Sequence, residues 1–134
     1  MTRFMLDTNV VSTVIRARSR QLDRRVADAS PNALCVSIIT YAETAFGLAK
    51  RPGATALADA AGDFFSRTAV LDFDFEAGRT FGSLRALLER RGTPLSPLDT
   101  LIAAHAVSVR ATLVSNDQAF RMVPDLLVED WTEA

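Results

Sequence analysis

The stretch FMLDTNVVS, residues 4–12, joins a short apolar run to a helix start through a single acid. The run Phe4–Leu6 predicts a buried strand, because short continuous apolar runs are typical of strands covered on both faces. Asp7, Thr8 and Asn9 are residue types whose side-chain oxygens accept the free N–H groups of a first helical turn. The carboxylate of Asp7 therefore has two explanations: it is a helix cap, or it is one part of a site assembled from several strand ends.

The same strand-then-helix pattern continues along the chain. Apolar runs predict strands at residues 3–6, 33–39, 68–73 and 111–115, and residues 126–131 are a candidate fifth strand. Helical patterns cover residues 8–18, 20–29, about 41–49, 54–66, 74–92 and 96–110. Short apolar strands that alternate with helices indicate a parallel sheet with helices on both faces. We therefore expect an α/β fold, a three-layer α/β/α sandwich around a mainly parallel central sheet.

Two of the predicted helices have distinctive faces. In residues 74–92, Ala77, Phe81, Leu84 and Leu88 form one apolar stripe, and Gly92 is the predicted stop. Residues 96–110 are rich in small side chains, which suits close packing against a sheet. In an open parallel sheet the functional site lies at the carboxyl ends of the strands.

Composition sets the class of protein. The 134 residues are 49% hydrophobic and 23% charged, which predicts one globular domain over residues 1–134. Cys35 is the single cysteine, so no internal disulfide can form, and we expect it to pack in the core. No apolar run approaches the roughly 18 residues of a membrane span, and no secretory pattern opens the chain. We expect a cytoplasmic protein without a membrane partner.

The basic residues are unevenly distributed, although the net charge is only −1. All but Lys50 of the 15 are arginines, and one short segment holds five of them: Arg16, Arg18, Arg20, Arg24 and Arg25. Guanidinium forks suit phosphate oxygens. The segment is thus a candidate RNA-contacting surface, and a solvated helix face is the alternative.

Four acids fall at or just after element boundaries on one rim of the expected sheet. Asp7 follows the first strand, Glu43 lies in the first turn after the second, Asp99 begins the 96–110 helix, and Asp117 follows the fourth strand. Each has a local explanation as part of a helix start: Thr40-x-x-Glu43 matches a capping box, and Ser96 precedes a proline at the first helical position.

Convergence of four acids argues for more than capping. Clustered carboxylates repel one another unless a cation lies between them. Oxygen-only ligands favour Mg²⁺ or Mn²⁺, which can activate water next to a phosphate. His105 is the only histidine and lies about 120° around its helix from Asp99, so we expect it to be a packing or surface residue and not a ligand.

The motifs, taken in order, resemble the PIN-domain ribonucleases, specifically the VapC toxins of bacterial toxin–antitoxin pairs. The matching segments cover nearly the whole chain: FMLDTNVVS, SIITYAETAFG, RALLERRGTPLSPLDTLIAAHA, TLVSNDQAFRMVPDL and a final VEDW. The resemblance implies metal-dependent endonucleolytic cleavage of RNA, often in tRNA or ribosomal RNA loops. It also implies a homodimer and inhibition by a VapB-type antitoxin.

By this resemblance, Asp7, Glu43, Asp99 and Asp117 map onto the acidic metal site and are the candidate catalytic residues. Asp7 and Asp99 would hold the principal Mg²⁺, and Glu43 would orient or deprotonate the attacking water. Thr8, Asn9 and Asn116 match the supporting polar residues of the family. The fourth acidic position varies in the family, where asparagine sometimes stands in place of Asp117.

The acids are open to three other interpretations. A phosphatase with a D-x-D nucleophile needs an acid where Asn9 stands, and a receiver-type phosphoacceptor needs a lysine near the last strand, where Lys50 is not. A catalytically degenerate PIN fold that only binds RNA or protein is the remaining alternative. The presence of all four acids counts against it.

Overall fold

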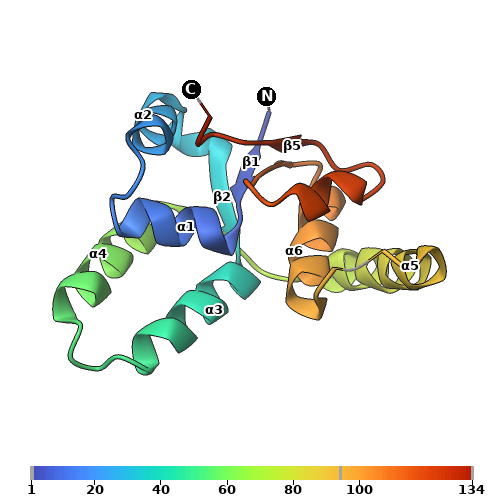
Figure 1. Cartoon of the computed structure of the whole chain (residues 1–134), viewed down its shortest axis with the longest axis horizontal. Helices are drawn as coiled ribbons and strands as arrows, with labels where there is room; N and C mark the ends of the chain where they lie inside the picture. The colour runs from blue at the N-terminus through green and yellow to red at the C-terminus, as the bar shows by residue number, and fades with distance from the viewer. Residues whose placement is uncertain (1, 94, 134) are drawn as a thin grey trace.

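Five parallel strands form one sheet in the computed structural model, which describes residues 2–93 and 95–133 (Figure 1). The strand order is β3-β2-β1-β4-β5, with β1 in the centre. The strands are β1 (Phe4–Leu6), β2 (Leu34–Ser37), β3 (Ala69–Leu71), β4 (Thr112–Val114) and β5 (Val128–Glu129). The expected three-layer α/β/α architecture is confirmed, and every strand pair is parallel.

In the part of the chain that the structure describes, six α-helices cover the two faces of this sheet. They are α1 (Thr8–Ile15), α2 (Arg20–Asp28), α3 (Ile38–Ala49), α4 (Thr55–Ser66), α5 (Phe75–Arg91) and α6 (Pro97–Ser108). Two short 3₁₀ turns are η1 (Pro31–Ala33) and η2 (Gln118–Met122). Figure 1 shows α1, α2 and α4 gathered on one side of β1 and the α5–α6 pair on the other. Within the described residues, none of the helices combines the length and apolar character needed to cross a membrane.

Alternation along the strands builds two separate cores. In β1, Met5 packs with Leu113 of β4 under α5 and α6, whereas Leu6 packs with Val36 of β2 and Val114 on the opposite face. Successive side chains of a strand point to opposite faces, so both faces must be covered by helices. The short strands are therefore mostly apolar rather than alternating.

The α5 and α6 helices follow their sequence signals closely. Asp74 accepts a hydrogen bond from the N–H of Ala77 at the start of α5, and Gly92 ends the helix with a positive φ of 64°. Ala77, Leu84 and Leu88 of the predicted stripe are buried. On α6, Ala103, Ala104 and Ala106 are buried at the sheet, as the small side chains of this segment predicted.

Several predicted boundaries were wrong. The strand expected at 33–39 ends at Ser37, whose hydroxyl caps the N–H of Ile39, so α3 begins at Ile38 rather than near 41. Two β-branched isoleucines at a helix start made this boundary look like strand. Thr40 therefore lies inside α3 and is not its cap. The first helix stops at Ile15, and Ala17 adopts a positive φ of 52° before α2 begins.

His105 is a core residue, which confirms its predicted packing role. Its Nδ1 lies 2.7 Å from the Ser37 hydroxyl, and its ring meets that of Phe73 edge-on at 5.3 Å. Desolvation by burial lowers the pKa of His105, an effect opposed by the nearby charges of Asp74 and Asp72. The side chain thus joins α6 to the carboxyl end of β2.

Close approach of α6 to the sheet gives a test of the fold. Ala103→Leu adds three carbons at a fully buried position, and we expect a loss of about 1–3 kcal/mol in the free energy of unfolding from overpacking. Ala86→Leu is the matched control, because Ala86 is exposed on α5. Urea denaturation of both variants measures the difference, and equal stabilities would contradict the packing described.

Candidate active site

Asp7 stands at the centre of the sheet edge and caps α1. It directly follows β1, its backbone N–H donates to the carbonyl of Val114, and its Oδ1 accepts from the N–H of Val10 at 2.8 Å. Only 3% of the residue is exposed. The local explanation is thus correct, since Asp7 is the N-cap of α1. The capping hydrogen bond uses only one of the two carboxylate oxygens of Asp7.

Burial and neighbouring charge keep Asp7 from ionising easily. Its pKa is raised from 3.8 to about 6, mainly because burial removes the carboxyl from water, and the negative charges of Asp99 and Asp117 contribute to this rise. Hydrogen bonds from the Ser115 hydroxyl and the Val10 N–H act in the opposite direction. The charged form of a buried carboxyl among other carboxylates is unfavourable. A bound cation would remove this penalty by stabilising the charged form.

Asp117 reaches this place through the topology of the sheet. The chain runs from β1 outward through β2 and β3, then returns to add β4 on the other side of β1. In open parallel sheets, binding sites lie at the carboxyl ends of the strands where the order reverses in this way. Asp7 follows β1 and Asp117 follows β4, so both acids lie at this reversal. Asp117 also caps η2, accepting from the N–H of Ala119 at 2.9 Å.

Asp99 is contributed by the first turn of α6. The Ser96 hydroxyl accepts from the N–H of Asp99 at 3.1 Å, so Ser96 and not Asp99 is the helix cap. Partial burial raises the pKa of Asp99, and the charge of Asp117 adds to the rise, against a hydrogen bond from Ser96. The three aspartates therefore sense one another electrostatically.

Glu43 belongs to α3 and meets the site through hydroxyl groups. Because α3 begins at Ile38, Glu43 lies in its second turn, which corrects the expected first-turn position. The Thr8 hydroxyl donates to Glu43 Oε1 at 2.7 Å and lies 3.2 Å from the buried Thr40 hydroxyl. Since Thr8 has one hydroxyl proton, the shorter contact takes it, and Thr40 can donate to Thr8 in turn. These contacts hold Glu43 beside the residue that follows Asp7.

The donor set suits a hard divalent cation, although the ligands are not closely gathered. The side chains of Asp7, Asp99, Glu43 and Asp117 offer oxygen only, the chemistry that Mg²⁺ and Mn²⁺ prefer. Among residues 2–93 and 95–133, no three His, Cys, Asp or Glu side chains stand together as a complete ligand group. Mg²⁺ commonly keeps several waters and uses one or two direct carboxylates, so this looser spacing is compatible with it.

Sequence reasoning missed two hydroxyls at this edge. Ser115 is buried, its hydroxyl lowers the pKa of the Asp7 carboxyl, and it accepts from the N–H of Asp117 at 3.0 Å. Thr40, read as a cap, supports Thr8 instead. The sequence does contain a signal for Ser115, because it is a polar residue directly after an apolar strand. Asn9 and Asn116 are exposed next to the acids they flank.

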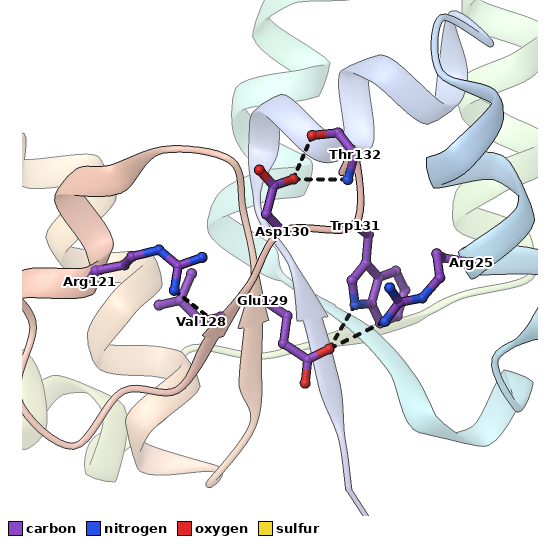
Figure 2. A network of polar contacts seen from close by, with 7 residues as sticks. All are labelled: Arg25, Arg121, Val128, Glu129, Asp130, Trp131 and Thr132. Carbon is purple, nitrogen blue, oxygen red and sulfur yellow. Dashed lines mark hydrogen bonds and ion pairs between the residues drawn. The ribbon is translucent and has the colours of Figure 1, made fainter. Parts of the chain in front are cut away.

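The five arginines of the basic segment do not form one uniform surface. Figure 2 shows Arg25 of α2 bound to the end of the chain, with its guanidinium 4.9 Å from the Trp131 ring and 3.5 Å from Glu129 Oε1. The Trp131 indole N–H donates to the same oxygen at 2.9 Å. Arg25 therefore holds α2 against β5. Arg16 lies at the end of α1, nearer the acids in sequence, and donates to the Ser12 hydroxyl.

Comparison with known proteins places this geometry in one group. The PIN domain family model matches residues 4–126. A tRNA(fMet)-specific endonuclease VapC from Salmonella typhimurium is 35% identical over 98% of this chain and 99% of its own length. Ribonuclease VapC2 from Haemophilus influenzae is 36% identical over 98% of this chain and 99% of its own length.

Solved structures agree with the sequence matches. A DNA-bound VapBC from Salmonella typhimurium superimposes with a TM-score of 0.91 at 35% identity, covering 98% of this chain and 99% of that one. VapBC2 from Rickettsia felis, bound to a promoter DNA fragment, gives 0.88 at 28% identity, covering 97% and 99%. The likeness extends over nearly the whole length of each chain.

The raised pKa of Asp7 predicts a stability gain on neutralisation. Asp7→Asn keeps a capping oxygen. The folded-state pKa of Asp7 is higher than its unfolded value, so its contribution to stability is fully present below pH 3.8 and is lost as pH rises through about 6. In EDTA at pH 7 we expect Asp7→Asn to be more stable than wild type by up to about 3 kcal/mol.

The difference should shrink toward zero near pH 4, where wild-type Asp7 is protonated. Denaturation of both proteins across pH 4–7.5 measures it, and the wild-type comparison cancels the separate titration of His105. A variant less stable than wild type at pH 7 would show that capping dominates over charge burial at this position.

Proposed function

The chain belongs to the PIN-domain family and, within it, to the VapC ribonucleases, and we propose that it is a metal-dependent endoribonuclease that acts as the toxin of a type II toxin–antitoxin pair. The observation that carries the proposal is the burial of Asp7 at the carboxyl end of β1, where the charges of Asp99 and Asp117 are near enough to raise its pKa. The matched range, residues 4–126, and the single sheet support one PIN domain over the chain.

The proposed ligand set follows from the donors. Asp7 and Asp99 would hold the principal Mg²⁺ or Mn²⁺, and Glu43 and Asp117 would contribute directly or through water. When bound, the ion supplies polarisation of a water and neutralises charge on the phosphate under attack. The buried Ser115 hydroxyl favours the charged form of the Asp7 carboxyl, the form that binds a cation.

Glu43 is the proposed group that orients or deprotonates the attacking water. Thr8 donates to one of its oxygens, which leaves the second oxygen as the acceptor for a water proton. Asn9 and Asn116 are exposed amides at the rim, where they can donate to phosphate oxygens. Arginines around an acidic crevice would supply the attraction to an RNA backbone that the crevice itself lacks.

The alternative is a PIN fold that binds RNA or protein without cutting. That reading predicts lost or neutralised acids, and all four are present here. It also gives no reason to bury Asp7 between two other aspartates, where it costs folding stability without metal. Cleavage is therefore the better-supported function.

We also propose a homodimer and a VapB-type antitoxin as partners. Solved relatives are VapBC complexes, by their own descriptions. On α3 of this chain, Tyr41 and Phe46 expose large apolar surface, as do Phe75 at the start of α5 and Leu98 on α6. Apolar side chains on neighbouring helices are suitable for burial against a second copy.

The metal requirement gives a direct test. We expect purified protein to cut RNA in Mg²⁺ or Mn²⁺ and to stop when EDTA is added, with tRNA(fMet) as the first substrate to try. Asp7→Asn and Asp99→Asn should each lower the cleavage rate by at least about a hundredfold, because each removes a proposed ligand.

Ser83→Ala on α5 is the control, since Ser83 is exposed and belongs to none of the proposed roles. Mg²⁺ should raise the melting temperature of wild type more than that of Asp7→Asn, by an amount that grows with ion concentration. Cleavage that persists in EDTA would reject the metal-dependent mechanism.

The antitoxin proposal is tested with the neighbouring gene. We expect a small DNA-binding protein to be encoded beside this chain, to co-purify with it and to inhibit RNA cleavage in proportion to its amount. The free toxin should elute as a dimer in light-scattering chromatography. A neighbouring protein that neither binds nor inhibits would contradict the assignment as toxin.

A further inference from the structure

A pocket of about 190 Å³ opens beside the proposed site, between α1, α3 and α4. One end is polar and is formed by Thr8, Asn9 and Glu43 of the site itself. The other end is apolar and includes Ile15, Leu48 and Leu57. The pocket therefore continues directly from the proposed place of cleavage into a small apolar recess.

We propose that this pocket takes one nucleobase of the RNA, next to the phosphodiester bond that is cut. The inference rests on the proposed ribonuclease function and deepens it by assigning a subsite. RNA cut in single-stranded loops offers unstacked bases, which proteins bind in pockets through ring faces and polar edges.

Size and charge favour a base over other parts of the RNA. The volume is below the roughly 300 Å³ at which pockets take drug-sized ligands, so the recess suits a single ring system. The Glu43 carboxylate at the polar end would repel a phosphate but can accept a hydrogen bond from a base N–H. The apolar end suits the faces of a flat, neutral ring.

Arg16 provides the neighbouring backbone contact. It lines the pocket and caps the C-terminal end of α1, with its Nε donating to Ser12 at 3.3 Å. The helical rise puts it about 13 Å along α1 from Asp7, too far to serve the phosphate at the acids. Its remaining N–H donors suit a phosphate on the far side of the bound base.

Gly47 of α3 provides a way to fill the pocket without disturbing the core. It lines the pocket, and a Cβ built there meets nothing within 4 Å. Gly47→Leu should fold at least as well as wild type, because leucine is a better helix former than glycine. Gly82→Leu is the matched control: it is also an open helical glycine, but on α5.

The experiment combines pocket filling with removal of single bases. The cut in a short single-stranded RNA is first mapped with wild type in Mg²⁺ or Mn²⁺, and RNAs with one abasic nucleotide at each nearby position are then compared. We expect the wild-type kcat/KM to fall about tenfold or more at one position beside the cut. On intact RNA, Gly47→Leu should have a kcat/KM lower than that of wild type by a similar factor. On the RNA that lacks this base, its kcat/KM should not fall any further. Gly82→Leu should behave as wild type on both RNAs.

Three outcomes would overturn the proposal. If wild type cuts RNA and Gly47→Leu loses as much activity as wild type at each abasic position, the pocket does not bind the base. The ribonuclease function would then stand without this subsite. If Gly47→Leu cuts RNA normally but escapes the neighbouring antitoxin, the pocket holds a protein segment instead. If wild type cuts no RNA, the proposed function fails and the subsite with it.

A second variant tests the backbone contact. Arg16→Gln should raise KM on every RNA, abasic or intact, and reduce the slope of log KM against log salt by about 0.7, the value for one phosphate contact on a single strand. The kcat at saturation should stay near wild type, since Arg16 lies away from the acids. An unchanged KM and salt slope would remove Arg16 from the subsite.

Discussion

Parallel pairing of β1 with β2 on one side and β4 on the other is the constraint on which the site depends. It places three residues of the chain, Leu6, Ser37 and Val114, at the ends of adjacent strands on one edge. The residues that follow them are Asp7, the start of α3, and Ser115. Without this pairing, acids more than 100 residues apart would not approach one another.

Burial of Asp7 combines a structural role with a functional one in the same carboxylate. Its Oδ1 satisfies an N–H at the start of α1, which any short polar side chain could do. Burial beside Asp99 and Asp117 raises its pKa and makes the fold less stable at neutral pH than a neutral side chain would. Sites that sacrifice stability in this way are typically functional. A bound cation would reverse the balance, so the proposed metal binding would be linked to folding stability.

The distribution of positive charge complements this acidic edge. The net charge is −1, so the protein as a whole does not attract RNA. Attraction has to come from particular arginines, and their contacts differ. Arg25 is held between Trp131 and Glu129, where it fixes α2 against β5 (Figure 2). Arg16 instead lines the pocket between α1, α3 and α4. A basic segment in sequence is thus divided between packing and a surface that faces the proposed substrate.

Local patterns determined most of the architecture. Short apolar runs, the stripe of α5, Gly92 and the small residues of α6 report interactions within a few residues, and these predicted the parallel three-layer fold and the four candidate acids. Hydroxyl partners required the tertiary structure, because Ser115 and Thr40 meet Asp7 and Thr8 only when β1, β4 and α3 are packed together. The start of α3 was misread because isoleucines suit both a strand and a helix start, and the capping contact of Ser37 decides between them. The pocket between α1, α3 and α4 is likewise invisible in sequence, since it is formed by side chains whose separation along the chain bears no relation to their distance in space.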